Sequence, residues 1–290
     1  MEQQSTIQWY PGHMAKAKRL VQQNLKLVDV VIELLDARIP ISSRNPMIDK
    51  ILGSKPRLVV LNKADLADPE ITEQWEEALK EKHIITVAVD SVKGRGFAEI
   101  PKAAKRLVAE KMAEMAAAGR RPRAVRCMVL GIPNVGKSSF INRLSRRRSA
   151  KTGDTPGVTK GKQMIKINKD MELLDTPGIL WPKFEDAEVG LKLAATGAIK
   201  EQVVNVEEVA LYLLKILTKI KPENLTARYK LSDIGEDSFQ LLQQIGARRG
   251  MLLSGGVVDT HKAAVLVLKE FRAGKLGRIS LERPGEEGIN

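Results

Sequence analysis

The segment spanning residues 124–144 restricts the possible folds of this chain more than any other. An apolar run at 124–130 leads into GIPNVGKS at 131–138, and a helical pattern follows at 137–144. The loop fits the pattern G-x-x-x-x-G-K-[ST] in the strand, loop and helix context that this pattern requires. Glycines at these positions let backbone N–H groups close around phosphate oxygens at a helix N-terminus. The segment therefore predicts an α/β fold that carries a phosphate-binding loop.

The residue types in this loop suit the triphosphate of a nucleotide and its metal ion. We expect Lys137 to neutralise the β and γ phosphates during catalysis and Ser138 to ligate Mg²⁺. A chance glycine-rich turn is the other interpretation, but the strand and helix patterns on either side argue against it. Neighbouring residues are also expected to contact the nucleotide: Asn134, Val135, Gly136 and Ser139.

Strand-like and helical patterns alternate before about residue 205, which is typical of a parallel sheet with crossover helices. We expect strands at residues 28–35, 57–61, 84–89, 124–130 and 172–174, and helices at 71–81, 97–118, 137–144 and 188–198. After that point only amphipathic helices are expected, at 206–220, 238–245 and 260–272. The chain is thus predicted to form an α/β domain over 1–204 and a smaller all-helical domain over 205–290.

A second motif, D-T-P-G at residues 175–178, follows the last predicted strand. An aspartate at a strand end can reach the magnesium shell, so Asp175 is a candidate ligand, and Gly178 leaves room for its N–H to approach the γ phosphate. The spacing from the phosphate loop leaves room for one helix, one loop and one strand. Within the intervening TGDTPGVTKGKQ we favour Thr159 as the residue that meets Mg²⁺ and the γ phosphate, with Thr155 second.

The segment VVLNKAD at residues 59–65 ends a predicted strand with the base-reading signature N-K-x-D. The Asp65 carboxylate can accept hydrogen bonds from N1–H and the 2-amino group of guanine, whereas adenine offers neither donor there. Asn62 and Lys63 complete the motif. Ser91 lies in a Ser-Val-Lys loop after the next strand, where valine replaces the alanine usual in base-contacting loops. These elements predict binding of GTP and GDP.

The order of these motifs along the chain is unusual. The base-reading elements come first, and the phosphate loop, the threonine-rich segment and the magnesium aspartate follow. This order is a circular permutation of the usual GTP-binding domain, which is tolerated where termini lie close together and the new break falls in an exposed loop. The predicted fold class is α/β, a circularly permuted P-loop GTPase domain with a parallel-rich sheet, followed by the helical domain. Because the segment after Gly178 leads directly into that domain, loss of the γ phosphate would reposition it.

The positive charge of the chain is concentrated in one segment. The net charge is +13, and residues 102–169 carry 18 basic and 3 acidic side chains. This density suits the phosphates of a nucleic acid, although a solvated basic face is the other interpretation. The N-terminus lacks a basic leader followed by an apolar stretch, and no apolar run approaches the roughly 18 residues of a membrane span. We therefore expect a cytoplasmic protein with no membrane partner.

The chain resembles the circularly permuted ribosome biogenesis GTPases. The resemblance rests on IQWYPGHMAKA, LLDARIPISSRNP, LNKADL, GIPNVGKSSFINRL, TGDTPGVT, LLDTPGILWPKFED and RRGMLLSGG, which together span nearly the whole sequence. It implies a GTPase that binds the large ribosomal subunit during late assembly, with a helical C-terminal domain that contacts rRNA. No DNA partner is expected.

The residue that orients the attacking water is not evident from the sequence. Many GTPases place a glutamine just after the D-x-x-G motif, but this chain has Ile179, so we expect low intrinsic turnover and activation by a partner. The family resemblance points to His13 as the catalytic residue, with an RNA-contacting or merely exposed role as the alternative. Asn134 resembles the asparagine of potassium-stimulated GTPases, which would add K⁺ as a cofactor; an ordinary loop asparagine is the other interpretation.

Two further functions fit parts of the sequence. A non-catalytic RNA-binding scaffold that holds GTP is suggested by the missing glutamine. A signalling GTPase with a protein effector is also conceivable, but the basic segment at 102–169 argues against it. Turnover with purified ribosomal subunits distinguishes the scaffold from a ribosome-binding GTPase that hydrolyses GTP. Salt-sensitive binding to those subunits distinguishes a signalling GTPase from both.

Overall fold

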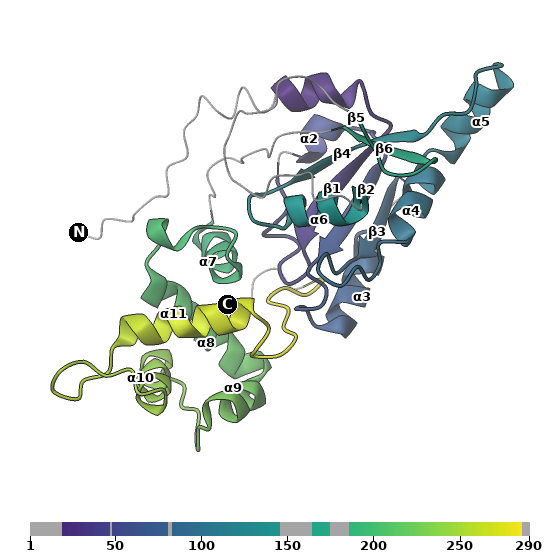
Figure 1. Ribbon diagram of the computed structural model, residues 1–290. Coiled ribbons are helices and arrows are strands. Elements are labelled where there is room, and N and C mark those ends of the chain that lie inside the picture. Colours follow the sequence, from purple (N-terminus) through teal and green to yellow (C-terminus); the bar gives the residue numbers. More distant parts are fainter. Residues whose placement is uncertain (1–18, 47, 81–82, 146–163, 175–185, 286–290) are drawn as a thin grey trace.

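The computed structural model describes residues 19–46, 48–80, 83–145, 164–174 and 186–285. These residues form a six-stranded sheet in the order β3-β2-β1-β4-β6-β5 (Figure 1). Neighbouring strands are parallel except for β5 and β6, which are antiparallel. The strands are β1 (Val30–Asp36), β2 (Arg57–Asn62), β3 (Ile84–Ala88), β4 (Val125–Gly131), β5 (Met164–Lys166) and β6 (Met171–Leu174).

Helices connect the strands, and helices joined by loops follow the sheet in the described chain. Five follow or connect the strands: α2 (Ile48–Leu52), α3 (Pro69–Ala78), α4 (Glu99–Leu107), α5 (Ala109–Ala117) and α6 (Lys137–Ser145). The later ones are α7 (Ala187–Thr196), α8 (Val206–Ile220), α9 (Pro222–Tyr229), α10 (Ser238–Arg248) and α11 (Thr260–Arg272). None of the helices in the described ranges combines the length and apolar character needed to cross a membrane.

Several helices begin where a short polar side chain accepts backbone N–H groups of the first turn. Such N-caps accept hydrogen bonds from backbone N–H groups that have no partner inside the helix, and they mark the residue at which the helix begins. The capping residues are Asp68 before α3, Asp186 before α7, Asn205 before α8, Asp237 before α10 and Asp259 before α11.

The sheet is covered on both faces. Strands β1 and β2 are buried along their whole length, which explains why both are mainly apolar in the sequence. Successive side chains of a strand point to opposite faces. Val59 and Leu61 belong to a cluster with Trp75 of α3, whereas Leu58 and Val60 belong to the main core.

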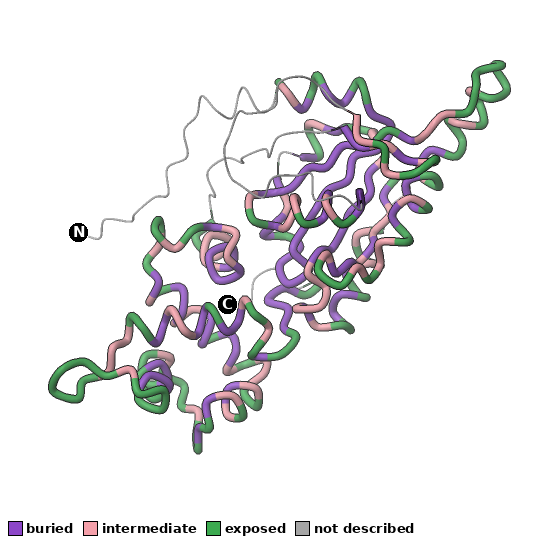
Figure 2. The backbone as a smooth tube through the Cα atoms, in the orientation of Figure 1, coloured by how far each residue is buried: buried purple, intermediate pink, exposed green. Residues whose placement is uncertain are grey.

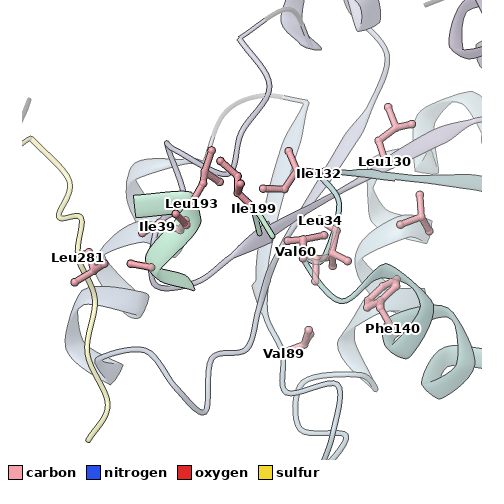
Figure 3. Close-up of a cluster of buried hydrophobic side chains, with 14 of the residues drawn as sticks. Leu34, Ile39, Val60, Val89, Leu130, Ile132, Phe140, Leu193, Ile199 and Leu281 are labelled. Atoms are coloured by element: carbon pink, nitrogen blue, oxygen red, sulfur yellow. The ribbon is translucent and has the colours of Figure 1, made fainter. Parts of the chain in front are cut away.

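The main core continues from the sheet into the helical part without a break. Leu193 and Ile199, in and after α7, lie in the same cluster as Ile39 and Ile132 of the sheet loops (Figure 3). Leu281, near the end of the described chain, joins them. The buried residues are concentrated along the central strands, with further buried stretches in the helical part (Figure 2). The two parts therefore share one apolar interior.

The predicted combination of a parallel-rich sheet followed by helices is confirmed, with local differences. The helix expected at 97–118 is two helices, because the backbone leaves the helical region at Val108. Strand β5 and helix α9 were not predicted; α9 begins at Pro222. The boundary at residues 204 and 205 remains a prediction. Helix α7, which precedes that boundary, packs against α8 and α11.

Candidate nucleotide-binding site

The carboxyl ends of the five parallel strands meet at one edge of the sheet. In open α/β sheets this edge is where ligands bind. The register pairs Asp36 of β1 with Asn62 of β2, and Leu34 of β1 with Gly131 of β4. Strand β6, which ends at Leu174, runs parallel to β4 on its other side. The turn after β2 and the loop after β4 are therefore brought together across the end of β1.

The phosphate loop runs from the end of β4 into α6, as the sequence predicts. Helix α6 begins at Lys137, and the N–H of Phe140 donates to the carbonyl of Gly136 at 2.9 Å. Ser138 is half-buried and Ser139 is exposed in the first turn. The N–H groups of a first turn have no partner within the helix, so this position suits an anion.

Gly136 occupies a position where a side chain does not fit. Its φ of 100° lies in the left-handed region that favours glycine. A Cβ atom here would lie 2.5 Å from Nδ2 of Asn62. The glycine thus allows the phosphate loop to approach the base-reading motif closely.

Direct hydrogen bonds join the base-reading motif to the phosphate loop. Nδ2 of Asn62 donates to the carbonyl of Val135 at 2.8 Å, and Nζ of Lys63 donates to the carbonyl of Asn134 at 3.3 Å. The Ser91 hydroxyl donates to Oδ1 of Asn62 at 2.7 Å, which brings in the loop after β3. Three segments that are distant in sequence therefore converge on Asn62, which is buried.

A buried carboxylate at the end of β1 holds Lys63. Nζ of Lys63 lies 3.0 Å from Oδ2 of Asp36, and Arg38 donates to the same carboxylate from Nε at 2.9 Å and Nη2 at 2.8 Å. Burial alone raises the pKa of Asp36, but the two cations outweigh it and hold that pKa well below its ordinary value. Asp36 is therefore ionised and fixes the position of the lysine.

Asp65 lies in the turn that follows β2 and is half-buried. Among the described residues, none forms a hydrogen bond or ion pair with its carboxylate. The neighbouring Ser91 loop is shaped by Asp90, whose Oδ1 accepts the N–H groups of Val92 and Lys93 at 2.8 and 2.9 Å. This arrangement suits a base that presents two N–H donors to one carboxylate.

Asn134, the candidate potassium ligand, is exposed and has a φ of 57°. Its Nδ2 donates to the carbonyl of Ala198, after α7, at 3.3 Å. The phosphate loop is therefore in contact with the helical part as well as with Lys63. The oxygen of the same side-chain amide is the atom that would bind a cation.

Several predicted site residues lie outside the described residues: His13, Thr155, Thr159, Asp175 and Gly178. Asp175 directly follows β6, whose last residue, Leu174, pairs with Met128 of the phosphate-loop strand. Within the described ranges no group of three His, Cys, Asp or Glu side chains could hold a metal ion. Of the predicted magnesium ligands, Ser138 lies within the described residues, and its hydroxyl is an oxygen donor, the kind of ligand that Mg²⁺ prefers.

The sequence interpretation assigned no role to Asp36 or Arg38. Asp36 follows a buried strand, as Asn62 does, and the rule that parallel strands end at one edge could have identified it. Arg38 is fully buried, which its sequence neighbourhood does not indicate.

Comparison with known proteins places these features in a family. A family model described as "50S ribosome-binding GTPase" matches residues 126–243. Ribosome biogenesis GTPase A of Bacillus cereus is 56% identical over 97% of this chain and 95% of its own length. The protein of the same name from Thermotoga maritima is 31% identical over 96% of this chain and 95% of its own length. Mitochondrial ribosome-associated GTPase 1 of Mus musculus is 38% identical over 95% of this chain and 90% of its own length.

The fold also matches solved structures. GNP-bound YlqF from T. maritima aligns with a TM-score of 0.63 at 26% identity, covering 93% of this chain and 99% of that one. The GDP-bound structure of the same protein aligns with a TM-score of 0.62 at 25% identity, covering 92% and 100%. These two solved structures are described as GNP-bound and GDP-bound.

Proposed function

This chain belongs to the ribosome biogenesis GTPase A family, and from that premise we propose that it binds the large ribosomal subunit late in assembly and hydrolyses GTP under the subunit's stimulation. Membership makes the chain a circularly permuted GTPase that acts in ribosome assembly. The usual Mg²⁺ dependence of the GTPase domain accompanies that activity. The large subunit, its rRNA and the stimulation are the proposed part.

The observation that best supports a guanine-nucleotide site is the direct contact between two motifs that are far apart in sequence. Asn62 donates to the carbonyl of Val135, and Lys63 donates to the carbonyl of Asn134. These pairs are separated by 73 and 71 residues. One nucleotide has a base at one end and phosphates at the other. Its binding site therefore requires a base-reading turn next to a phosphate loop.

We assign roles within this site as follows. Asp65 accepts the N1–H and 2-amino groups of guanine, and Asn62, Lys63 and Ser91 fix the turn that presents it. Lys137 and the first turn of α6 bind the phosphates. Mg²⁺, when bound, neutralises charge on the β and γ phosphates. Its proposed protein ligands are Ser138, Thr159 and Asp175, with Gly178 approaching the γ phosphate and Val135, Gly136 and Ser139 lining the loop.

Water activation is assigned to the partner-bound state. Ile179 cannot orient water, so His13 is the proposed catalytic residue once the ribosome orders the N-terminal segment. We also propose that the side-chain carbonyl of Asn134 holds K⁺ beside the phosphates, where a cation stabilises the charge that develops during transfer.

Charge and family support an RNA partner. Among the described residues of the basic segment, several arginines are exposed: Arg120, Arg121, Arg126 and Arg143. The family description and the mitochondrial relative's name both refer to the ribosome. We propose that this surface and the helical domain over 205–290 contact rRNA, and that residues 1–204 form the GTP-binding domain of a cytoplasmic protein.

The deciding measurement is the GTP turnover rate with and without purified large subunits, in KCl and in NaCl of equal ionic strength. We expect subunits to raise the rate at least about tenfold, and KCl to support a higher rate than NaCl. Lys137→Ala should abolish turnover, whereas Lys50→Ala, a change at an exposed lysine of α2, should not. His13→Ala should lose stimulation but retain subunit binding. Equal rates with and without subunits would contradict the proposal.

A further inference from the structure

The chain returns to the sheet after α11. Residues 276–283, which we call the C-terminal strap, leave the helical part and run toward the loops near α3 (Figure 1). Leu276, Ile279 and Leu281 of the strap are buried. The N–H of Leu281 donates to the carbonyl of Arg38 at 2.8 Å, and the indole N–H of Trp75 donates to the carbonyl of Glu282 at 3.1 Å. The strap is therefore anchored on the α/β part at several points.

Three successive strap residues bind the backbone of the turn that contains Asp65. Arg278 donates from Nη2 to the carbonyl of Ala64 at 2.8 Å and from Nε to the carbonyl of Ala67 at 2.9 Å. The N–H of Ile279 donates to the carbonyl of Leu66 at 2.9 Å. The hydroxyl of Ser280 accepts the N–H of Asp68 at 3.1 Å. Four backbone polar groups between residues 64 and 68 are thus satisfied by the strap.

We propose that the C-terminal strap positions the guanine-reading turn, and that Arg278 is a positioning residue that sets the preference for guanine. The inference rests on the proposed role of Asp65. Two hydrogen bonds from N1–H and the 2-amino group require a carboxylate held in one orientation. Arg278 binds the carbonyl of Ala64, directly before Asp65, and the carbonyl of Ala67, two residues after it, and it makes no bond to the Asp65 side chain.

Without the guanidinium, these carbonyls would be satisfied by water, and the turn would sample other orientations. Ordering it again on binding costs conformational entropy, which lowers affinity. The loss falls mainly on ligands that use both hydrogen bonds to Asp65. Inosine nucleotides lack the 2-amino group, so they are the ligands that should depend less on the strap.

The chain offers a matched control on the same strap. Arg278 is exposed, so its removal deletes two hydrogen bonds without opening the core. Arg283 is also exposed, and within the described part of the chain no hydrogen bond or ion pair involves its side chain. Arg278→Ala and Arg283→Ala remove the same charge from neighbouring positions, and Arg278→Lys keeps the charge but not the forked donor.

The experiment measures the dissociation constants of GDP and IDP by calorimetry for the full-length chain and these variants. Arg278→Ala should weaken GDP binding about tenfold, the equivalent of one or two hydrogen bonds, and IDP binding less. The ratio of the IDP constant to the GDP constant should fall, by about threefold on the same reasoning. Arg278→Lys should give an intermediate ratio, and Arg283→Ala the wild-type ratio.

An unchanged ratio in Arg278→Ala overturns the inference, whether both affinities are retained or both fall equally. A lower melting temperature with the same ratio also overturns it, because that result indicates a purely structural role. Asp65→Ala separates this failure from failure of the proposed site. If the wild-type chain does not prefer GDP to IDP, or if Asp65→Ala leaves that preference intact, the assignment of Asp65 itself is wrong.

Discussion

In the proposed site, Asp65 determines the choice of base through a single carboxylate. Its neighbours in the turn are held through their backbone, and its side chain has no partner among the described residues. When binding depends on an unpaired polar group of the site, the affinities for matching and non-matching bases differ strongly. A ligand that lacks the complementary donors leaves that group desolvated and unsatisfied.

Asp65→Asn should exchange guanine for xanthine as the preferred base. Xanthine presents a carbonyl where guanine has the 2-amino group, so the Asn amide can donate to it. GDP affinity should fall by about 100-fold, since two hydrogen bonds to a charged group are lost or weakened. Affinity for XDP should rise correspondingly, and competition against a fluorescent nucleotide measures both. Asp233→Asn, at an exposed position, is the control; an undiminished GDP preference in Asp65→Asn would remove guanine reading from this residue.

The phosphate loop depends on a backbone shape that its glycine permits. Helix α6 can begin directly after the loop because Gly136 takes a left-handed φ and gives its carbonyl to the first helical hydrogen bond. The same residue leaves room for Nδ2 of Asn62. The start of the helix and the contact with the base-reading turn are therefore one structural feature.

Gly136→Ala should reduce nucleotide affinity while the chain stays folded. The new methyl group would face both an unfavourable φ and a contact of 2.5 Å with Asn62. We expect GDP binding to weaken at least about tenfold, from a strain of roughly 1–3 kcal/mol. Gly190→Ala in α7 is the matched control, since nothing lies within 4 Å of a Cβ there and alanine favours helix. Calorimetry and thermal melting that gave the two variants equal affinity would contradict this account.

The sequence predicted elements well where burial and periodicity agree. Strands β1 and β2 are mainly apolar and are buried at every position, whereas β5 is three residues long and none of them is buried. The break between α4 and α5, at Val108, escaped prediction because strong helix formers flank that residue on both sides. Helix α5 has no buried residue, so the spacing of its apolar residues indicates little about where the chain stops packing against the sheet.

The candidate site was predicted to the extent that it consists of motifs. Their motifs predicted that Asn62 and the phosphate loop belong to one nucleotide-binding site, and the structure brings the two into contact. The strap was not predictable, because Arg278 and Ile279 bind backbone carbonyls, and a carbonyl leaves no trace in residue type. Contacts of this kind become visible only when the whole chain is folded.

The α/β and helical parts are joined by a buried arginine as well as by a shared apolar interior. Arg38 follows β1 and donates to Asp36 from two nitrogens. Its Nη2 also donates to the carbonyl of Thr196, at the end of α7, at 3.2 Å, and its guanidinium lies 5.3 Å from the ring centroid of Phe271 in α11. One side chain therefore connects the nucleotide-binding edge of the sheet to two helices of the other part.

Arg38→Leu should destabilise the whole chain and not one part of it. The substitution leaves the carboxylate of Asp36 buried with Lys63 as its remaining cation, and breaking a buried pair in this way costs about 3–5 kcal/mol. Urea unfolding should show this loss in the free energy of unfolding when followed by circular dichroism and by tryptophan fluorescence alike.

Arg126→Leu is the comparison, because Arg126 is exposed on β4 and lies 3.8 Å from Glu172. An exposed ion pair contributes under about 1 kcal/mol, so this variant should unfold nearly as the wild type does. Equal losses of unfolding free energy in Arg38→Leu and Arg126→Leu would mean that Arg38 does not contribute to stability as a buried ion. If Arg38→Leu instead gives two separate transitions, the arginine is what makes the two parts unfold together, and the shared apolar interior alone is insufficient to couple them.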